Sequence, residues 1–188
     1  MPDRDHDPYA TLSALFNDIW TRIGRGVADR RAPARHPILA TSGVRGGGEA
    51  RVVVLRAASR AAGTIEVHTD AASAKVAELQ ADPRATLLIW DEGARLQIRL
   101  RLNMSMRPGT EAEWAWVPDP SRRAYGGTPP PGAALMAPDH HDPTPSMARF
   151  MIVEGEVLEI DALFLGAARH KRALFRRETA WEGEWIAP

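Results

Sequence analysis

The sequence predicts a mainly β protein, a small antiparallel β-barrel flanked by a few helices. Leu96, Ile98, Leu100 and Leu102 alternate with polar residues, which is typical of a strand with one buried face. Other short apolar segments are separated by turns rich in glycine and proline. The glycine-rich segment 42–48 between two of them suits a hairpin connection. Several short antiparallel strands with few helices favour a small barrel.

The N-terminal part predicts an amphipathic helix over residues 8–28. Asp7 followed by Pro8 is typical of a helix N-cap and first helical position. Residues 25–36 end at Pro37 and predict a frayed helix end that leads into a loop. The apolar residues of the helix recur at helical spacing and form one face to bury: Tyr9, Leu12, Leu15, Phe16, Ile19, Trp20 and Ile23.

The middle of the chain predicts four strands and one short helix. The strands are expected over residues 38–41, 51–57, 64–69 and 86–90. The helix is expected over residues 74–81, because a proline follows it in the Asp82-Pro83 pair. The alternating segment 96–102 then adds a fifth strand.

The remaining segment begins with a proline-rich excursion over residues 107–147. It holds nine of the fifteen prolines, which excludes regular sheet from most of it, and excursions of this length are commonly functional or interface-forming. Within it, Thr110 and Glu113 predict a capping box for a short helix. After it we expect a long strand over 150–160 with a possible bulge at Gly155, a helix over 161–168, and closing strands over 173–177 and 185–187.

Composition limits the possible functions. A chain of 188 residues fits one domain, 1–188, and 24 basic against 24 acidic residues give no overall charge to attract nucleic acid or a membrane surface. The absence of cysteine excludes thiolate metal sites and fits a reducing compartment. No apolar segment resembles a signal peptide or a membrane span, so a cytoplasmic protein is expected. His140, His141 and Asp142 are the one cluster of metal-ligand types, but adjacent ligands cannot complete a tetrahedral site alone, so no metal is predicted.

Five short motifs occur in a characteristic order between residues 51 and 101. They are Arg-Val-Val-Val-Leu-Arg over 51–56, His68-Thr69, Ser73-Ala74-Lys75, Asp82-Pro83-Arg84 and Leu96-Gln97-Ile98-Arg99. This order resembles the pyridoxamine 5′-phosphate oxidase-like, FMN-binding split-barrel family, over roughly residues 35–159 and the last twenty residues. The resemblance implies a six-stranded antiparallel split β-barrel with flanking helices. It also implies a homodimer that binds FMN between its subunits.

The resemblance also implies which residues hold the cofactor. A phosphate needs guanidinium or ammonium donors, and the helix N-terminus after Ser73 adds partial positive charge. Arg51 and Arg56 are five residues apart and point to opposite faces of one ideal strand, which favours Arg51 and Lys75 as the phosphate contacts. The full set implied is Arg51, Val52, Val53, Val54, Leu55, Arg56, His68, Thr69, Ser73, Lys75, Gln97 and Arg172.

The reaction is less well defined than the cofactor. Candidate catalytic residues are His170, Arg122 and Tyr125, and Ala168 stands where the family has an arginine that binds the substrate. The leading hypothesis is an FMN-binding oxidoreductase resembling pyridoxamine 5′-phosphate oxidase, with hydride transfer from a small substrate to FMN N5. The alternatives are a nicotinamide-dependent flavin reductase and a non-catalytic flavin-binding module on the same barrel.

Overall fold

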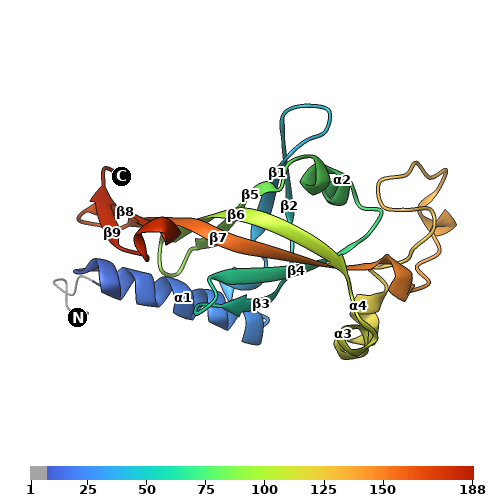
Figure 1. Ribbon diagram of the computed structural model, residues 1–188, viewed down its shortest axis with the longest axis horizontal. Helices are drawn as coiled ribbons and strands as arrows, with labels where there is room; N and C mark the ends of the chain where they lie inside the picture. The colour runs from blue at the N-terminus through green and yellow to red at the C-terminus, as the bar shows by residue number, and fades with distance from the viewer. Residues whose placement is uncertain (1–7) are drawn as a thin grey trace.

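A computed structural model describes residues 8–188 and shows one antiparallel sheet with a few helices (Figure 1). The predicted fold class is therefore confirmed, although the described residues form nine strands in place of six. The strands are β1 (Ile38–Ser42), β2 (Gly48–Val52), β3 (Leu55–Ser59), β4 (Thr64–Asp70), β5 (Arg84–Asp91), β6 (Leu96–Pro108), β7 (Phe150–Leu165), β8 (His170–Arg176) and β9 (Gly183–Ile186). The α-helices are α1 (Leu12–Ala28), α2 (Ala74–Ala81), α3 (Glu111–Trp116) and α4 (Asp119–Arg122), and four short 3-10 turns complete the set: η1 (Pro33–Arg35), η2 (Pro138–His140), η3 (Met147–Arg149) and η4 (Arg177–Thr179).

The sheet is curved into a barrel that stays open along one seam. Its strand order is β2-β1-β5-β6-β7-β4-β3, so β2 and β3 are at opposite edges although only Val53 and Val54 separate them in the chain. Because the three Cα–Cα steps from Val52 to Leu55 span at most about 11 Å, the sheet must curl until its edges nearly meet. The strand predicted over 51–57 was therefore wrong, because it is two strands that meet at this seam.

Strand β7 is the longest and is paired along both edges. Strand β6 follows one edge, while β4 and β8 share the other edge at opposite ends. The helix predicted over 161–168 was wrong, because pairing with β6 and β8 keeps the chain extended to Leu165. The bulge also differs from the prediction: Arg101 is opposite Glu159 and Leu102 is opposite Val157, so the extra residue is Leu158. Gly155 pairs in register with Met104 instead.

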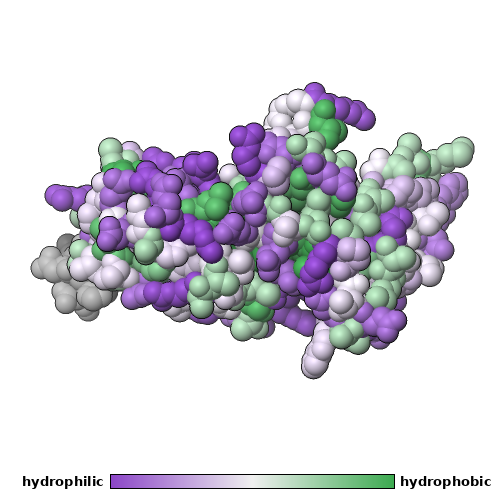
Figure 2. Space-filling model, viewed as in Figure 1, coloured by the Kyte–Doolittle hydropathy of each residue, from purple (hydrophilic) through white to green (hydrophobic). Residues whose placement is uncertain are grey.

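One face of the sheet carries exposed apolar residues near β1, β2 and β5. Ile38 is opposite Val52 and Leu88, and Trp90 follows Leu88 by two residues, so all four share a face. Val52 and Trp90 are 64% and 47% exposed. Gln97 is opposite Trp90 on the same face. Figure 2 shows hydrophobic surface among hydrophilic residues around the base of the projecting β1–β2 hairpin.

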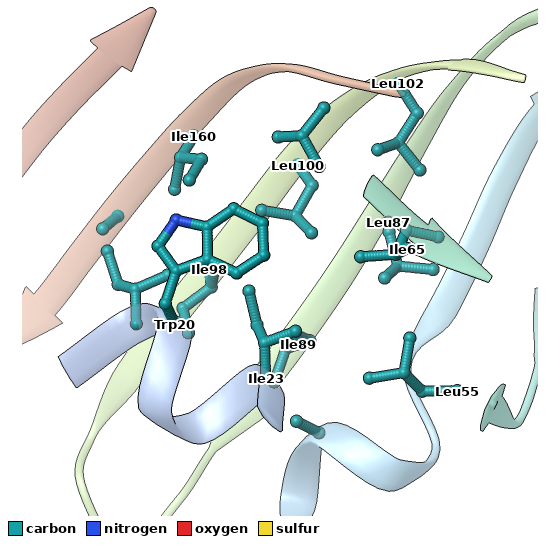
Figure 3. Close-up of a cluster of buried hydrophobic side chains, with 14 of the residues drawn as sticks. Trp20, Ile23, Leu55, Ile65, Leu87, Ile89, Ile98, Leu100, Leu102 and Ile160 are labelled. Carbon is teal, nitrogen blue, oxygen red and sulfur yellow. The ribbon is translucent and has the colours of Figure 1, made fainter. Parts of the chain in front are cut away.

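Helix α1 closes the other face and completes the core. It begins at Leu12 with Thr11 as N-cap, whose hydroxyl accepts the Ala14 N–H at 3.1 Å, and so not at Pro8; Asp7 lies outside the described residues. The helix stays regular to Ala28, so the fraying predicted from residue 25 is absent up to that residue. Figure 3 shows side chains of α1 packed against the central strands; the labelled core residues are Trp20, Ile23, Leu55, Ile65, Leu87, Ile89, Ile98, Leu100, Leu102 and Ile160.

The proline-rich excursion forms a small second cluster. The predicted capping box is present, with the Thr110 hydroxyl bonded to the Glu113 N–H and the Glu113 carboxylate bonded back to the Thr110 N–H. Val117 and Tyr125 of the excursion pack against Phe150 and Ile152 of β7. The excursion therefore has its own apolar contacts with one end of the sheet. None of the helices described between residues 8 and 188 is long and apolar enough to cross a membrane.

Two glycines of α1 provide a matched test of how this helix packs. A Cβ on Gly26 would lie 2.6 Å from the Ala34 carbonyl carbon, whereas a Cβ on Gly24 would meet nothing within 4 Å. We expect Gly26→Ala to lower the free energy of unfolding by about 1–3 kcal/mol through overpacking. Gly24→Ala should raise it by about 0.5–1 kcal/mol through helix propensity. Urea denaturation measures both changes, and equal effects of the two substitutions would contradict this packing.

Candidate functional site

Four of the residues implied to hold the cofactor come together where α2 begins: three of the implied phosphate contacts, and Thr69, which the resemblance places at the ring or the ribityl chain. Arg51 comes from β2, Thr69 from the end of β4, Ser73 is the N-cap of α2, and Lys75 lies in its first turn. The Lys75 ammonium donates to the Thr69 hydroxyl at 3.0 Å, and the Thr69 and Ser73 hydroxyl oxygens are 2.9 Å apart. We call Arg51, Thr69, Ser73 and Lys75 the anion cradle.

The cradle concentrates positive charge in a partly buried place. Burial lowers the pKa of Lys75, the nearby Arg51 charge lowers it further, and Glu78 and Asp70 oppose the shift. The Ser73 hydroxyl makes no hydrogen bond to the helix backbone, so it does not cap the first-turn N–H groups of α2. Two cations, two hydroxyls and an uncapped helix N-terminus form an environment suited to a phosphate group.

A buried carboxylate, which sequence reasoning missed, holds Arg51 in place. Glu78 is only 4% exposed, and its Oε2 accepts the Arg51 Nη2 donor at 2.7 Å and the Thr41 hydroxyl at 2.6 Å. Arg51 also donates to the Thr41 hydroxyl. The sequence signal that could have identified Glu78 is its spacing. It lies three residues after Lys75, on the same helix face, and next to the apolar residue Leu79.

Gln97 and Arg172 lie outside the cradle, at the end of β7 opposite to Thr69. On β7, Leu163 is opposite both Gln97 of β6 and Arg172 of β8, whereas Met151 is opposite Thr69. Twelve residues of β7, about 40 Å of strand, separate these positions, although Gln97 is nearer to Arg51 across β5 and β1. Figure 1 accordingly shows β8 at the left end of the molecule and α2 well to its right. One copy of the chain therefore does not bring all the implied cofactor residues together.

Arg172 and its neighbours form a second polar group. The buried Asp161 carboxylate accepts Arg172 Nε at 2.9 Å and Nη2 at 2.7 Å, and it also accepts Arg99. Burial alone would raise the pKa of Asp161, but hydrogen bonds from the two arginines outweigh it and lower the pKa. His170 is exposed nearby and, with Trp185, lines a hollow of about 280 Å³.

The implied cofactor residues 52–56, which run from the end of β2 across the seam into β3, differ in their exposure. Val52 is exposed at the end of β2, while Val53 and Leu55 are buried. Val54 is half-buried in the short link at the seam. Arg56 lies on β3 at a register shift opposite β4, and its Nε is buried without a hydrogen-bond partner among the described residues. Arg51 and Arg56 are thus on opposite edges of the sheet.

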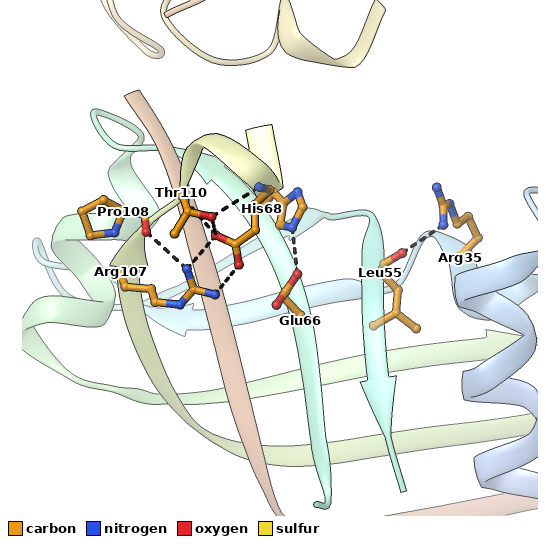
Figure 4. A network of polar contacts seen from close by, with 8 residues as sticks. Arg35, Leu55, Glu66, His68, Arg107, Pro108 and Thr110 are labelled. Atoms are coloured by element: carbon orange, nitrogen blue, oxygen red, sulfur yellow. Dashed lines mark hydrogen bonds and ion pairs between the residues drawn. The ribbon is translucent and has the colours of Figure 1, made fainter. Parts of the chain in front are cut away.

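His68 and Tyr125 lie near the place where the excursion packs on the sheet. His68 Nε2 is 2.8 Å from the Glu66 carboxylate, and its ring meets Phe150 edge-on with centroids 4.9 Å apart. Figure 4 shows the His68–Glu66 pair beside the capped turn at Thr110. Burial raises the pKa of Tyr125, and Arg56 opposes this shift.

The three candidate catalytic residues do not form one cluster. Arg122 is held by the Trp114 and Ala115 carbonyl oxygens at 3.1 and 3.3 Å, and it stacks 5.2 Å over the Trp114 ring. Tyr125 packs near the same ring, with centroids 6.1 Å apart. His170 lies at the other end of the molecule on β8. Within residues 8–188, no three side chains of metal-ligand type are grouped to hold an ion.

Asp70 joins the excursion to the cradle. It is buried directly after Thr69 and accepts the Gly126 N–H at 2.8 Å, the Ala72 N–H at 2.7 Å and Arg149 Nε at 2.9 Å. Gly126 belongs to the excursion and Arg149 to the turn that follows it. The Asp70 carboxylate thus links the end of β4, which carries Thr69, to the excursion at Gly126 and to the turn after it at Arg149.

Comparison with solved structures shows which fold this is. A pyridoxamine 5′-phosphate oxidase-related, FMN-binding protein from Nostoc punctiforme is 23% identical, with a TM-score of 0.73 over 99% of this chain and 100% of that one. PhzG from Burkholderia lata 383, solved with tetrahydrophenazine-1-carboxylic acid, is 20% identical, with a TM-score of 0.70 over 100% and 97% of the two chains. A general stress protein 26-related protein of the pyridoxinephosphate oxidase family from Clostridium acetobutylicum is 8% identical, with a TM-score of 0.58 over 90% and 98%.

These likenesses confirm the resemblance at the level of fold. The chain has the split-barrel fold of the pyridoxamine 5′-phosphate oxidase-related proteins, with its sheet left open. No family model and no curated protein matches the sequence.

Asp70→Asn tests whether the excursion depends on this carboxylate. The substitution removes the charge that Arg149 pairs with, so we expect the free energy of unfolding to fall by about 2–3 kcal/mol. Limited proteolysis within residues 107–147 should also become faster. The control is Asp142→Asn, an exposed residue whose side chain accepts hydrogen bonds from nearby Thr144. An excursion as resistant in Asp70→Asn as in the wild type would contradict the proposed link.

Proposed function

We propose that this protein binds FMN through the anion cradle and is an FMN-dependent oxidoreductase that takes hydride from a small substrate. The observation that carries the proposal is the convergence of Arg51, Lys75, Ser73 and Thr69 at an uncapped helix start. A doubly charged phosphate requires this combination of cations, hydroxyls and backbone N–H groups. The FMN-binding protein from Nostoc punctiforme has the same fold.

Two buried polar atoms without partners, on the strands β3 and β4, support a bound ring. Arg56 Nε and His68 Nδ1 are buried without hydrogen-bond partners among residues 8–188, although buried polar atoms are normally satisfied. Both residues lie on the strands that lead away from the cradle, β3 and β4. A flavin ring has polar edges that donate and accept hydrogen bonds, so it fits such a place. FMN when bound supplies the redox chemistry, and the chain's own residues hold and orient it.

A second copy of the chain would complete the site. Gln97 and Arg172 are about 40 Å of strand away from Thr69 of their own chain, and β1 and β5 lie between Gln97 and Arg51. Gln97 shares its face of the sheet with the exposed residues Ile38, Val52 and Trp90. Burying such a face against another copy removes apolar surface from water. We therefore propose a homodimer in which Gln97 and Arg172 of one copy approach the flavin held by the other.

Ala168 is evidence against pyridoxamine 5′-phosphate as the small-molecule substrate. Ala168, in the exposed turn between β7 and β8, has no side chain with which to bind a substrate phosphate. The same observation favours a second candidate, a nicotinamide-dependent flavin reductase. Anaerobic addition of reduced nicotinamides separates the two: loss of the flavin absorption supports the reductase, and oxidation of amines or alcohols with unchanged nicotinamide supports the oxidase. Protein-bound flavin that responds to neither would indicate a binding module.

Lys75→Met tests the cofactor site. The substitution removes one charge-assisted contact to the phosphate, so FMN affinity should fall about ten- to a hundredfold. Riboflavin, which has no phosphate, should bind the variant and the wild type equally. Equilibrium dialysis with flavin fluorescence measures both ligands. The control is Arg45→Met, a basic residue exposed in the β1–β2 turn. Equal FMN affinity in Lys75→Met and the wild type would remove Lys75 from the site.

Mixed dimers test whether two copies share each site. We expect Lys75→Met and Arg172→Ala each to weaken FMN binding when purified alone; Asp161 keeps Arg99 as a partner in the second variant. Coexpression of the two should return about one quarter of the sites to wild-type affinity, because half of the dimers are mixed and each mixed dimer has one intact site. The measurement is the fraction of tight sites in an FMN titration. No tight sites in the mixture would place Arg172 outside the partner's site.

A further inference from the structure

We propose that the Glu78 carboxylate is an internal stand-in for the phosphate: it holds Arg51 in position while the cradle is empty and weakens the binding of a phosphate that approaches beside it. The inference rests on the proposed function and adds a positioning residue to the same site. Glu78 lies on α2 and faces Arg51 of β2 and Thr41 of β1. Its role differs from that of Lys75, which belongs to the binding surface itself.

The first argument is the geometry around Glu78. A single oxygen, Oε2, accepts both the Arg51 guanidinium at 2.7 Å and the Thr41 hydroxyl at 2.6 Å. Such convergence of donors on one oxyanion is what a bound phosphate oxygen would receive. Because Glu78 is 4% exposed, it cannot move into solvent without rearranging α2. Arg51 is therefore already in its binding position before any ligand arrives.

The second argument is the balance of charge. The charged groups at the cradle are Arg51, Lys75 and Glu78, with Asp70 of β4 nearby but bonded to Arg149. The charge of Asp70 is balanced by Arg149, so Arg51, Lys75 and Glu78 together leave one net positive charge. A phosphate carries about two negative charges. Glu78 therefore repels the phosphate that the two cations attract. The same carboxylate screens Arg51 and Lys75 from each other in the empty protein.

Glu78→Gln separates these two effects, because the amide keeps an acceptor for Arg51 but removes the negative charge. At pH 8, we expect Glu78→Gln to bind FMN about tenfold more tightly than the wild type, with riboflavin unchanged, as expected for losing one like charge a few ångströms away. We also expect the empty variant to melt at a lower temperature. Inorganic phosphate should raise its melting temperature by more than that of the wild type.

Two control variants define the readout. Asp91→Asn removes another buried carboxylate that pairs with an arginine, Arg22, at 2.5 Å, but it lies outside the cradle. It should lower the melting temperature without any added response to phosphate or FMN. Glu78→Ala removes both the charge and the acceptor, so Arg51 loses its anchor. It should gain less FMN affinity than Glu78→Gln does.

Each outcome decides the inference. If the wild type binds FMN, Lys75→Met weakens that binding and Glu78→Gln is no tighter, the stand-in role is wrong and the proposed function stands. A Glu78→Gln protein that stays unfolded in saturating phosphate, while Asp91→Asn folds, would also overturn it. If no protein binds FMN but phosphate stabilises Glu78→Gln more than the wild type, Glu78 keeps this role for another phosphate ester and the FMN function is wrong.

Discussion

The pairing of β7 along both edges is the constraint on which the rest of the structure depends. Because β6 runs along one edge and β4 and β8 divide the other, β7 fixes how far apart the two polar groups lie. One end carries the excursion and the strand that ends at the cradle. The other end carries Arg172 and its buried partner Asp161. The sheet therefore places Thr69 and Arg172 near opposite ends of β7.

The seam between β2 and β3 determines where the two arginines of segment 51–56 lie. Arg51 is the second-to-last residue of β2. After Val52 the chain passes through Val53 and Val54 to the opposite edge of the sheet. Arg51 therefore faces α2, while Arg56 faces the excursion and Tyr125. Two arginines that look equivalent in sequence therefore lie in different environments: Arg51 is part of the anion cradle, and Arg56 lies beside Tyr125.

The family resemblance predicted the residues of the cradle, and tertiary contacts decided their surroundings. Ser73 and Lys75 were identified from the family's motif, whose adjacent residues also encode a helix start after a strand. Glu78 was not, because an acidic residue in a short helix is normally solvated, and only the approach of β1 and β2 buries it. The segment after Ile160 has alanine and leucine that suit a helix, yet pairing with two neighbouring strands overrides that preference. Sequence periodicity also could not show that residues 51–57 divide at a seam, because each half is a short strand.

Two of the arginines in the proposed flavin site have the same kind of ion pair, with a buried carboxylate. Arg51 is paired with the buried Glu78, and Arg172 is paired with the buried Asp161, which also holds Arg99. A buried carboxylate beside each arginine means that neither guanidinium needs a ligand to reach its position, so ligand binding there would order no arginine side chain. The cost would be electrostatic, because each carboxylate opposes an incoming anion. In the proposed function, this cost would fall on the phosphate at the cradle. At Arg172 the carboxylate lies between two arginines, so these three groups keep one net positive charge, which in the proposed dimer would attract the electron-rich edge of a ring held by the other copy.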